Sequence, residues 1–193
     1  MPKRFFLSLC LIPCLFPCLS PSLADPLPYN YRVIDDHIHA GGHPLNPATK
    51  FGNTDQQVLD ILEGLKDQGV YTVIDLENTG HIQKRYSRLL EEAGMERIHI
   101  PMNSSKVPTE EEWQRILEAM KEPVYIHCKW GADRTGAVIG RYLVEIDGYS
   151  PDGAYRAVIT GGAHAGPLGG LNKGYYYNNL KKFIFSGCQE NNR

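Results

Sequence analysis

The sequence carries little net charge of either sign. Its 193 residues include 20 lysines and arginines against 22 aspartates and glutamates, so the formal charge at pH 7 is −2. No basic stripe runs along the chain, and we therefore expect no nucleic-acid partner. Internal repeats, low-complexity tracts and linker-like stretches are also missing. We expect a single domain over residues 25–193, with its core at about 32–160, and a monomer.

The sequence also lacks an apolar run long enough to cross a membrane. The longest mostly apolar stretch covers positions 5–16, whereas a transmembrane helix needs about 20 residues. Two basic residues precede this stretch, and Ser22 and Ala24 follow it with the small side chains that a signal peptidase reads. The alternative is a buried N-terminal helix, which the prolines of this region oppose. We expect a signal peptide at 1–24, hence a domain that is periplasmic or secreted, with no integral membrane segment after cleavage.

Cysteine is scarce. The chain has five, and three of them lie within the segment that we expect to be removed. Only Cys128 and Cys188 would remain, and two cysteines do not make a disulfide scaffold. The sequence leaves open whether these two pair with each other.

Short β-branched stretches alternate with amphipathic helical patterns along the chain. The stretch 53–69, for example, has Thr54 as a capping residue, apolar residues three or four positions apart and a terminal Gly69. Such alternation predicts an α/β fold with a single central, mainly parallel sheet flanked by helices. We expect a short strand pair or hairpin at 31–40, strands at 70–76, 95–101 and 123–127, and helices at 53–69, 82–93, after Thr109, and at 136–148, 150–160 and 175–185.

Three histidines and two aspartates gather in the stretch VIDDHIHAGGHP, positions 33–44. His37 and His39 are two residues apart, so on a strand both rings would face the same side and could bind a divalent metal ion. IDDHIH also resembles the first metal-binding strand of amidohydrolases, but those enzymes are barrels of roughly 250 residues. The alternative is that Asp35 and Asp36 form a hairpin turn and that the histidines are surface or packing residues. We expect this alternative, and we expect neither a metal nor another cofactor.

The stretch HCKWGADRTG, positions 127–136, has the features of a phosphate-binding loop. Cys128 ends an expected strand, five residues separate it from Arg134, and a helix begins directly afterwards. Amides at the N-terminus of a helix bind anions, and Gly131 allows the loop to curl closely around one. The Arg134 guanidinium can bind two phosphate oxygens at once. The same field would stabilise a thiolate on Cys128, which would place a nucleophile beside the phosphorus atom.

This stretch matches the signature H-C-x5-R-[ST] of the cysteine-dependent protein tyrosine and dual-specificity phosphatases. The order and spacing of positions 33–160 are also similar to compact bacterial members of that family. The resemblance implies a dual-specificity phosphatase-like fold and hydrolysis of phosphomonoesters without a metal. It implies that Cys128 attacks phosphorus to form a phosphocysteine, that Arg134 binds the phosphoryl oxygens and that His127 orients the loop. The phosphate loop that it assigns contains Lys129, Trp130, Gly131, Ala132 and Thr135, and Thr135 would also hydrogen-bond the Cys128 sulfur.

The sequence departs from the family where the general acid is expected. In the family this acid is usually an aspartate on the loop after the preceding strand, and here that loop reads IPMNSSKVPTEEE, without an aspartate. Asp133 is the first candidate, because some similar phosphatases with DRT in the loop are thought to use that aspartate. Its alternative role is to brace the loop through backbone N–H groups. Asp75 and Glu77 come second, because the end of their strand should lie near the loop, and Glu110 comes third.

We expect phosphotyrosine in proteins as the substrate, with phosphoserine and phosphothreonine as further targets. A phosphoinositide is the alternative, because a lysine at the position of Lys129 also occurs in phosphoinositide phosphatases. Trp130 would either wall the pocket or pack on the outer side of the loop, and the glycine-rich segment 161–170 would border the site. Three other hypotheses remain: a phosphate-binding module without turnover, a sulfurtransferase, and a metal-dependent hydrolase that uses His37 and His39.

Overall fold

The computed structural model of the protein describes residues 26–46, 51–173 and 177–187. The expected signal peptide at 1–24 lies outside these ranges, as does Cys188. Across the described part of the chain, no helix combines the length and the apolar character that a membrane span requires.

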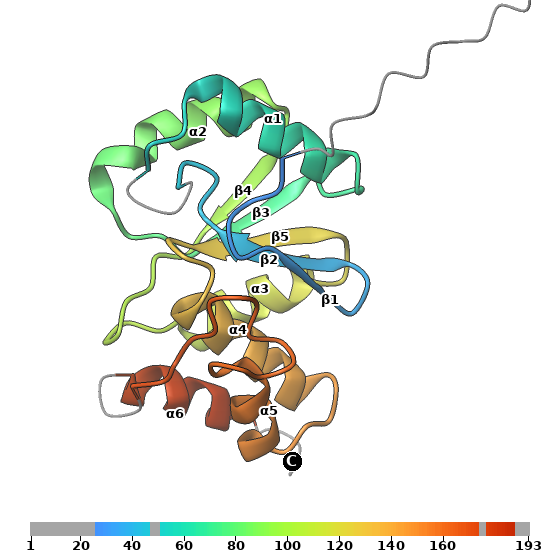
Figure 1. Ribbon diagram of the computed structural model, residues 1–193. Helices are drawn as coiled ribbons and strands as arrows, with labels where there is room; N and C mark the ends of the chain where they lie inside the picture. The colour runs from blue at the N-terminus through green and yellow to red at the C-terminus, as the bar shows by residue number, and fades with distance from the viewer. Residues whose placement is uncertain (1–25, 47–50, 174–176, 188–193) are drawn as a thin grey trace, which may run out of the picture.

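A five-stranded sheet forms the centre of the molecule (Figure 1), and its strand order is β1-β2-β5-β3-β4. β2, β5, β3 and β4 run parallel, and only β1 is antiparallel to its neighbour β2. The expected mainly parallel sheet and the expected hairpin are therefore confirmed. The strands are β1 (Arg32–Ile34), β2 (Ile38–Gly42), β3 (Thr72–Asp75), β4 (Glu96–His99) and β5 (Val124–Cys128).

The helices form where the capping and apolar patterns predict them. Thr54 and Thr109 each accept a hydrogen bond from the third helical residue, and the glutamine or glutamate at that position bonds back to the cap, which makes two capping boxes. The helix after the cysteine loop begins at Asp133, three residues earlier than expected. The helices are α1 (Asp55–Lys66), α2 (Gln83–Glu92), α3 (Glu110–Ala119), α4 (Asp133–Glu145), α5 (Pro151–Val158) and α6 (Asn178–Ser186), with a short 3-10 helix at Gly80–Ile82.

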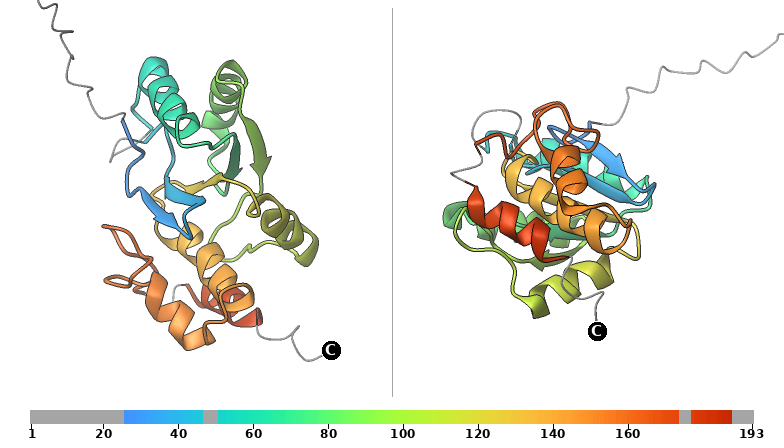
Figure 2. Two further views of the ribbon diagram at one scale, coloured as in Figure 1. Left: turned by 90° about the vertical axis from the view of Figure 1, so that its right-hand side faces the viewer. Right: turned by 90° about the horizontal axis from the view of Figure 1, so that it is seen from below.

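The helices cover both faces of the sheet (Figures 1 and 2). α1 and α2 pack on one face, where residues such as Leu62 and Tyr86 surround Val73 and Tyr125 of the strands. α3, α4, α5 and α6 pack on the other face, in a core that includes Cys128. Successive strand residues point to opposite faces, so each buried strand contributes to both cores. The expected flanking of one sheet by helices is confirmed.

The carboxyl ends of three parallel strands meet at one edge of the sheet. Gly42 at the end of β2 is paired with Cys128 at the end of β5, and Asp75 at the end of β3 is paired with His127. The segments that follow these strands are therefore brought together, although about 85 residues of sequence lie between Gly42 and Cys128. Such an edge is the usual place for a ligand in an open parallel sheet.

Candidate active site

Cys128 is the last residue of β5 and has only 2% of its surface exposed. The chain turns through residues 129–132 and enters α4 at Asp133. Ala132 is the N-cap residue of this helix and makes no side-chain capping bond. The first amides of α4, at the positive end of the helix dipole, therefore remain available for an anion beside the sulfur.

Gly131 gives the loop its shape. Its φ angle is +68°, in the left-handed region that favours glycine. A Cβ atom at this position would lie 2.1 Å from the carbonyl carbon of Gly41. The loop can thus pack directly against the backbone at the end of β2 only because residue 131 has no side chain.

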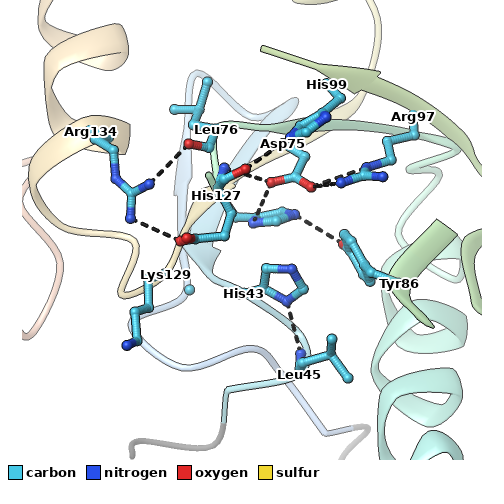
Figure 3. A network of polar contacts seen from close by, with 12 residues as sticks. His43, Leu45, Asp75, Leu76, Tyr86, Arg97, His99, His127, Lys129 and Arg134 are labelled. Atoms are coloured by element: carbon cyan, nitrogen blue, oxygen red, sulfur yellow. Dashed lines mark hydrogen bonds and ion pairs between the residues drawn. The ribbon is translucent and has the colours of Figure 1, made fainter. Parts of the chain in front are cut away.

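Arg134 is held at the mouth of this loop (Figure 3). Its Nη2 lies 2.9 Å from Oε2 of Glu77, and its Nη1 donates to the carbonyl oxygens of Leu76 at 3.1 Å and Met102 at 3.2 Å. Burial alone would lower the pKa of Arg134, but the negative charges of Cys128 and Glu77 outweigh burial and raise it. The guanidinium is therefore always charged and has a fixed orientation.

His127 lies under the loop in a buried polar network (Figure 3). Its Nε2 is 3.0 Å from the hydroxyl oxygen of Tyr86, and its Nδ1 is 3.7 Å from Oδ1 of Asp75. Asp75 is fully buried and forms an ion pair with Arg97 at 2.5 Å. Burial lowers the pKa of His127 more than Asp75 raises it, so the ring is neutral near pH 7.

Asp133 makes the bracing contact that the sequence allowed. Its Oδ1 accepts a hydrogen bond of 2.8 Å from the backbone N–H of Leu171. This bond ties the first turn of α4 to the end of the glycine-rich segment 161–170. A Cβ atom on Gly170 would lie 2.9 Å from the carbonyl carbon of Ala132, so the segment touches the phosphate loop. The expectation that 161–170 borders the site agrees with these contacts.

The other acid candidates have arginine partners. Asp75 and Glu77 do lie at the edge beside the loop, as their strand position predicted, but both are buried, Asp75 paired with Arg97 and Glu77 with Arg134. Glu110 lies in the first turn of α3 and accepts a hydrogen bond from Arg141 at 2.8 Å. In this arrangement each of the three carboxylates is the ion-pair partner of an arginine.

The rim of the loop carries one cation between aromatic rings. Nζ of Lys129 lies 5.0 Å from the ring centroid of Phe51 and 5.7 Å from that of Trp130. Trp130 also packs edge-on against Tyr29, with 6.1 Å between ring centroids, so it packs against a neighbouring segment. Thr135 is buried, and its Oγ1 has no hydrogen-bond partner among the described residues, so the expected bond to the Cys128 sulfur is not formed here.

His37 and His39, the histidines of the alternative metal site, both contact polar groups of the protein. His37 lies in the turn before β2, and its Nε2 is 2.9 Å from the carbonyl oxygen of Met120. His39 contacts the hydroxyl of Tyr31 at 2.5 Å. Asp35 and Asp36 form the turn with positive φ angles of 47° and 56°. The expected hairpin turn at Asp35 and Asp36 is confirmed, because β1 and β2 on either side of it pair antiparallel.

One other group of metal-binding side chains lies close together within the described ranges. His43, Asp75 and His127 each offer an atom within 4.8 Å of the other two, and all three are buried. Burial lowers the pKa of His43 well below its usual value, with contributions from His127, Arg97 and Arg134. The positive charges of these two arginines oppose a further cation, and Asp75 is already paired with Arg97. Nε2 of His43 and Nδ1 of His127 are buried without a hydrogen-bond partner among the described residues.

Several residues of this site were not predicted from the sequence to belong to it. His43 and Tyr86 surround His127, with ring centroids 4.7 Å and 5.4 Å from it. Asn30, Arg32 and Asn46 contact carbonyl groups of the phosphate loop. All lie more than 40 residues from their partners, so only the strand order could have revealed them.

The fold and the site together define a class of protein: a cysteine-dependent phosphatase of the dual-specificity and protein tyrosine type. A family model described as "Polymorphic toxin system, DSP-PTPase phosphatase" matches residues 49–148, which is just over half of the chain. The chain belongs to this family.

Known relatives agree with this assignment. The chain is 24% identical over 135 residues to human "Phosphatidylglycerophosphatase and protein-tyrosine phosphatase 1". This match covers 66% of the chain but only 62% of the human protein. The corresponding mouse protein is 25% identical over 141 residues, which cover 69% of this chain and 68% of that protein.

Solved structures share the fold. PTPMT1 in complex with PI(5)P is 21% identical, with a TM-score of 0.56 and coverage of 81% of this chain and 96% of that one. TpbA of P. aeruginosa in complex with pTyr is 16% identical, with a TM-score of 0.54 and coverage of 88% and 99%. At these identities the likeness concerns the arrangement of the sheet and its helices.

Proposed function

We propose that the protein hydrolyses phosphomonoesters through a phosphocysteine on Cys128. The observation that carries this proposal is the position of Cys128: it ends a strand, the loop 129–132 connects it to the N-terminus of α4, and Arg134 lies in the first turn of that helix. Amides and a guanidinium arranged in this way stabilise both a thiolate and the charge that develops on a transferring phosphoryl group.

The reaction has two steps. The Cys128 thiolate attacks phosphorus, the bond from phosphorus to the leaving oxygen breaks, and that oxygen takes a proton from the general acid. Water then attacks the phosphocysteine, gives a proton back to the same group and releases phosphate and the thiolate. Arg134 binds the equatorial oxygens in both steps. We assign the acid to Asp133, which has a second oxygen besides the Oδ1 that accepts from Leu171.

Phosphotyrosine in proteins is the proposed substrate. The Cys128 sulfur lies at the bottom of its loop with almost no exposed surface, which favours a phosphate on a long, flat stem over the shorter stems of phosphoserine and phosphothreonine. Binding of pTyr by TpbA, which shares the fold, supports this choice.

A phosphoinositide is the second candidate substrate. Lys129 is held at the rim between Phe51 and Trp130, where it could pair with a further phosphate on an inositol ring. The name of the human relative and the PI(5)P complex of PTPMT1 support this candidate.

Export of the protein is part of the proposal and rests on residues 1–24 alone. The apolar stretch after two basic residues and the small residues at positions 22 and 24 support a cleaved signal peptide. Expression of the full chain, followed by N-terminal sequencing of the protein outside the cytoplasm, tests this point. A mature protein that retains residue 1 would contradict it.

Phosphate release from p-nitrophenyl phosphate in excess chelator tests the activity. We expect turnover that Cys128→Ser abolishes. A metal-dependent hydrolase would lose activity with chelator and keep it in Cys128→Ser, and a pure binding module would bind phosphopeptides without turnover. Rates on matched panels of phosphotyrosine peptides and phosphoinositides then decide between the two substrate classes.

A further inference from the structure

The carbonyl group of Gly131 is held on the outer side of the phosphate loop by two side chains. Nδ2 of Asn30 donates to this oxygen at 3.0 Å, and Nη1 of Arg32 donates to it at 2.8 Å. Asn30 is buried and precedes β1, whereas Arg32 is the first residue of β1. About 100 residues of sequence separate both from the loop that they contact.

Holding this carbonyl also orients an amide. A trans peptide unit is planar, so its C=O and its N–H point in opposite directions. When the Gly131 carbonyl points toward Asn30 and Arg32, the N–H of Ala132 must point to the other side of the same peptide plane. That side is the interior of the loop, where an anion beside Cys128 would lie.

A second carbonyl of the loop is held in the same manner. The oxygen of Lys129 accepts a hydrogen bond of 2.8 Å from Nδ2 of Asn46 and one of 3.2 Å from the backbone N–H of His43. The N–H of Trp130 is thereby directed away from these partners. The carbonyl groups of Lys129 and Gly131 thus point away from the interior of the loop. The N–H groups of Trp130 and Ala132, which follow them, point into it.

Arg32 contributes a charge as well as a hydrogen bond. Its Nε donates to the carbonyl oxygen of His164 at 2.8 Å, and its Nη2 is buried without a hydrogen-bond partner among the residues described. Burial lowers the pKa of Arg32 to about 10, against the influence of Cys128 and Tyr125, so the side chain is still a cation at neutral pH. It is a second positive charge beside the loop, and Arg134 is the first.

We propose that Arg32, together with Asn30 and Asn46, is a positioning residue that holds the phosphate loop in its anion-binding conformation, and that Arg32 also promotes ionisation of Cys128. This inference rests on the proposed function, because it explains how the same loop is kept ready for phosphate. None of the three side chains needs to touch the substrate for this role.

The test measures the reactivity of Cys128 and the binding of phosphate by the loop, and it does not depend on substrate turnover. Iodoacetamide alkylation of Cys128 is followed by mass spectrometry of the peptide that contains it, first as a function of pH and then with increasing inorganic phosphate. The first series gives the pH midpoint of thiolate formation, and the second gives the phosphate concentration that protects the sulfur by half. The variants are Arg32→Gln, Arg32→Lys and Asn46→Ala, and the control is Arg115→Gln, which removes a charge from an exposed position on α3.

We expect Arg32→Gln to move the alkylation midpoint upward by about half a pH unit or more, because it removes a nearby cation. Arg32→Lys keeps the charge and should hold the midpoint near that of the wild type. Asn46→Ala should weaken protection by phosphate about tenfold, since the Lys129 carbonyl keeps only the longer of its two hydrogen bonds and the next amide is less firmly directed inward. Arg115→Gln should change neither quantity.

Unchanged midpoints and unchanged phosphate protection in Arg32→Gln and Asn46→Ala would overturn the inference, even if the wild type is an active phosphatase. Conversely, a wild-type protein that is alkylated at low pH and protected by phosphate, but that hydrolyses nothing, would remove the proposed function and leave the inference standing. If Arg32→Gln does not fold, as judged by circular dichroism, Asn46→Ala still decides through the phosphate series whether side chains outside the loop hold it, and unchanged protection there would overturn the inference.

Discussion

Oε2 of Glu77 lies 2.9 Å from Nη2 of Arg134, and the glutamate that makes this contact is only 1% exposed. The arginine that we assign to the phosphoryl group is thus oriented from behind by a buried carboxylate. Carbonyl groups of Leu76 and Met102 and the side-chain oxygen of Asn78 also accept hydrogen bonds from this arginine. The position of the guanidinium is therefore fixed by the protein before any substrate arrives.

Glu77→Gln should weaken the site through Arg134. Loss of the buried partner charge should lower kcat/KM for p-nitrophenyl phosphate by about tenfold to hundredfold and the free energy of unfolding by about 3 kcal/mol. Steady-state kinetics and urea unfolding measure the two effects. Glu118→Gln, which breaks an exposed pair with Lys121, is the control and should change both by little. Full activity in Glu77→Gln would refute the orienting role.

Asp133→Asn should lower kcat by an amount that depends on the leaving group of the substrate. A poor leaving group, such as the alkoxide of an inositol phosphate, needs a proton more than nitrophenolate does. We expect kcat to fall about a hundredfold or more on the alkyl substrate and much less on p-nitrophenyl phosphate. Equal losses on both substrates would instead assign Asp133 to bracing alone, through its bond to Leu171. The limb of the pH–rate profile that belongs to the acid should also disappear.

Gly131→Ala should abolish phosphate binding. The added Cβ would lie 2.1 Å from the carbonyl carbon of Gly41, and the φ angle of +68° would also be strained. Gly148→Ala is a matched control, because Gly148 has a φ angle of +69° but no atom within 4 Å of its Cβ position. The control should lose about 1 kcal/mol of stability from strain and keep its activity. Phosphate protection of Cys128 against alkylation compares the two variants.

The buried histidines predict an acid-sensitive fold. Burial lowers the pKa of both His43 and His127 below the unfolded value of 6.5. The unfolded state therefore binds more protons than the folded state as pH falls through 6.5, and stability must decrease in that direction, by up to about 1.4 kcal/mol per pH unit for each group. Urea unfolding at pH 7 and pH 5 measures this loss.

His43→Gln should reduce the loss of unfolding free energy between pH 7 and pH 5, because only His127 of the two buried histidines then remains to titrate. His81→Gln removes an exposed histidine and should leave the slope as it is. A wild-type protein equally stable at both pH values would contradict the neutral, buried state of these rings.

The sequence predicted the parts of the molecule that local patterns determine. Thr54 and Thr109 identified two helix starts, and the order of Cys128, Gly131 and Arg134 predicted a loop between a strand and a helix. The HxH spacing alone would have placed both histidines on one strand face, but the expected turn at Asp35 and Asp36 includes His37 and leaves it outside β2.

The supports of the loop could not be predicted in this way. Arg32 and Asn46 meet the loop only because β2 lies beside β5 in the sheet and β1 lies on the far side of β2, and no spacing in the sequence encodes that order. Likewise, the position of Glu77 at the sheet edge could be expected, but its ion pair with Arg134 depends on how the first turn of α4 is rotated.

The most direct test of the account is the identity of the group that carries the phosphoryl moiety. Wild-type protein is mixed with p-nitrophenyl phosphate, quenched in acid within milliseconds, digested and examined by mass spectrometry. We predict that one phosphoryl group is found on the Cys128 peptide and that none is found in Cys128→Ser, which should also be inactive. Continued phosphate release by Cys128→Ser, with no phosphoryl group on the wild-type peptide, would contradict the central claim.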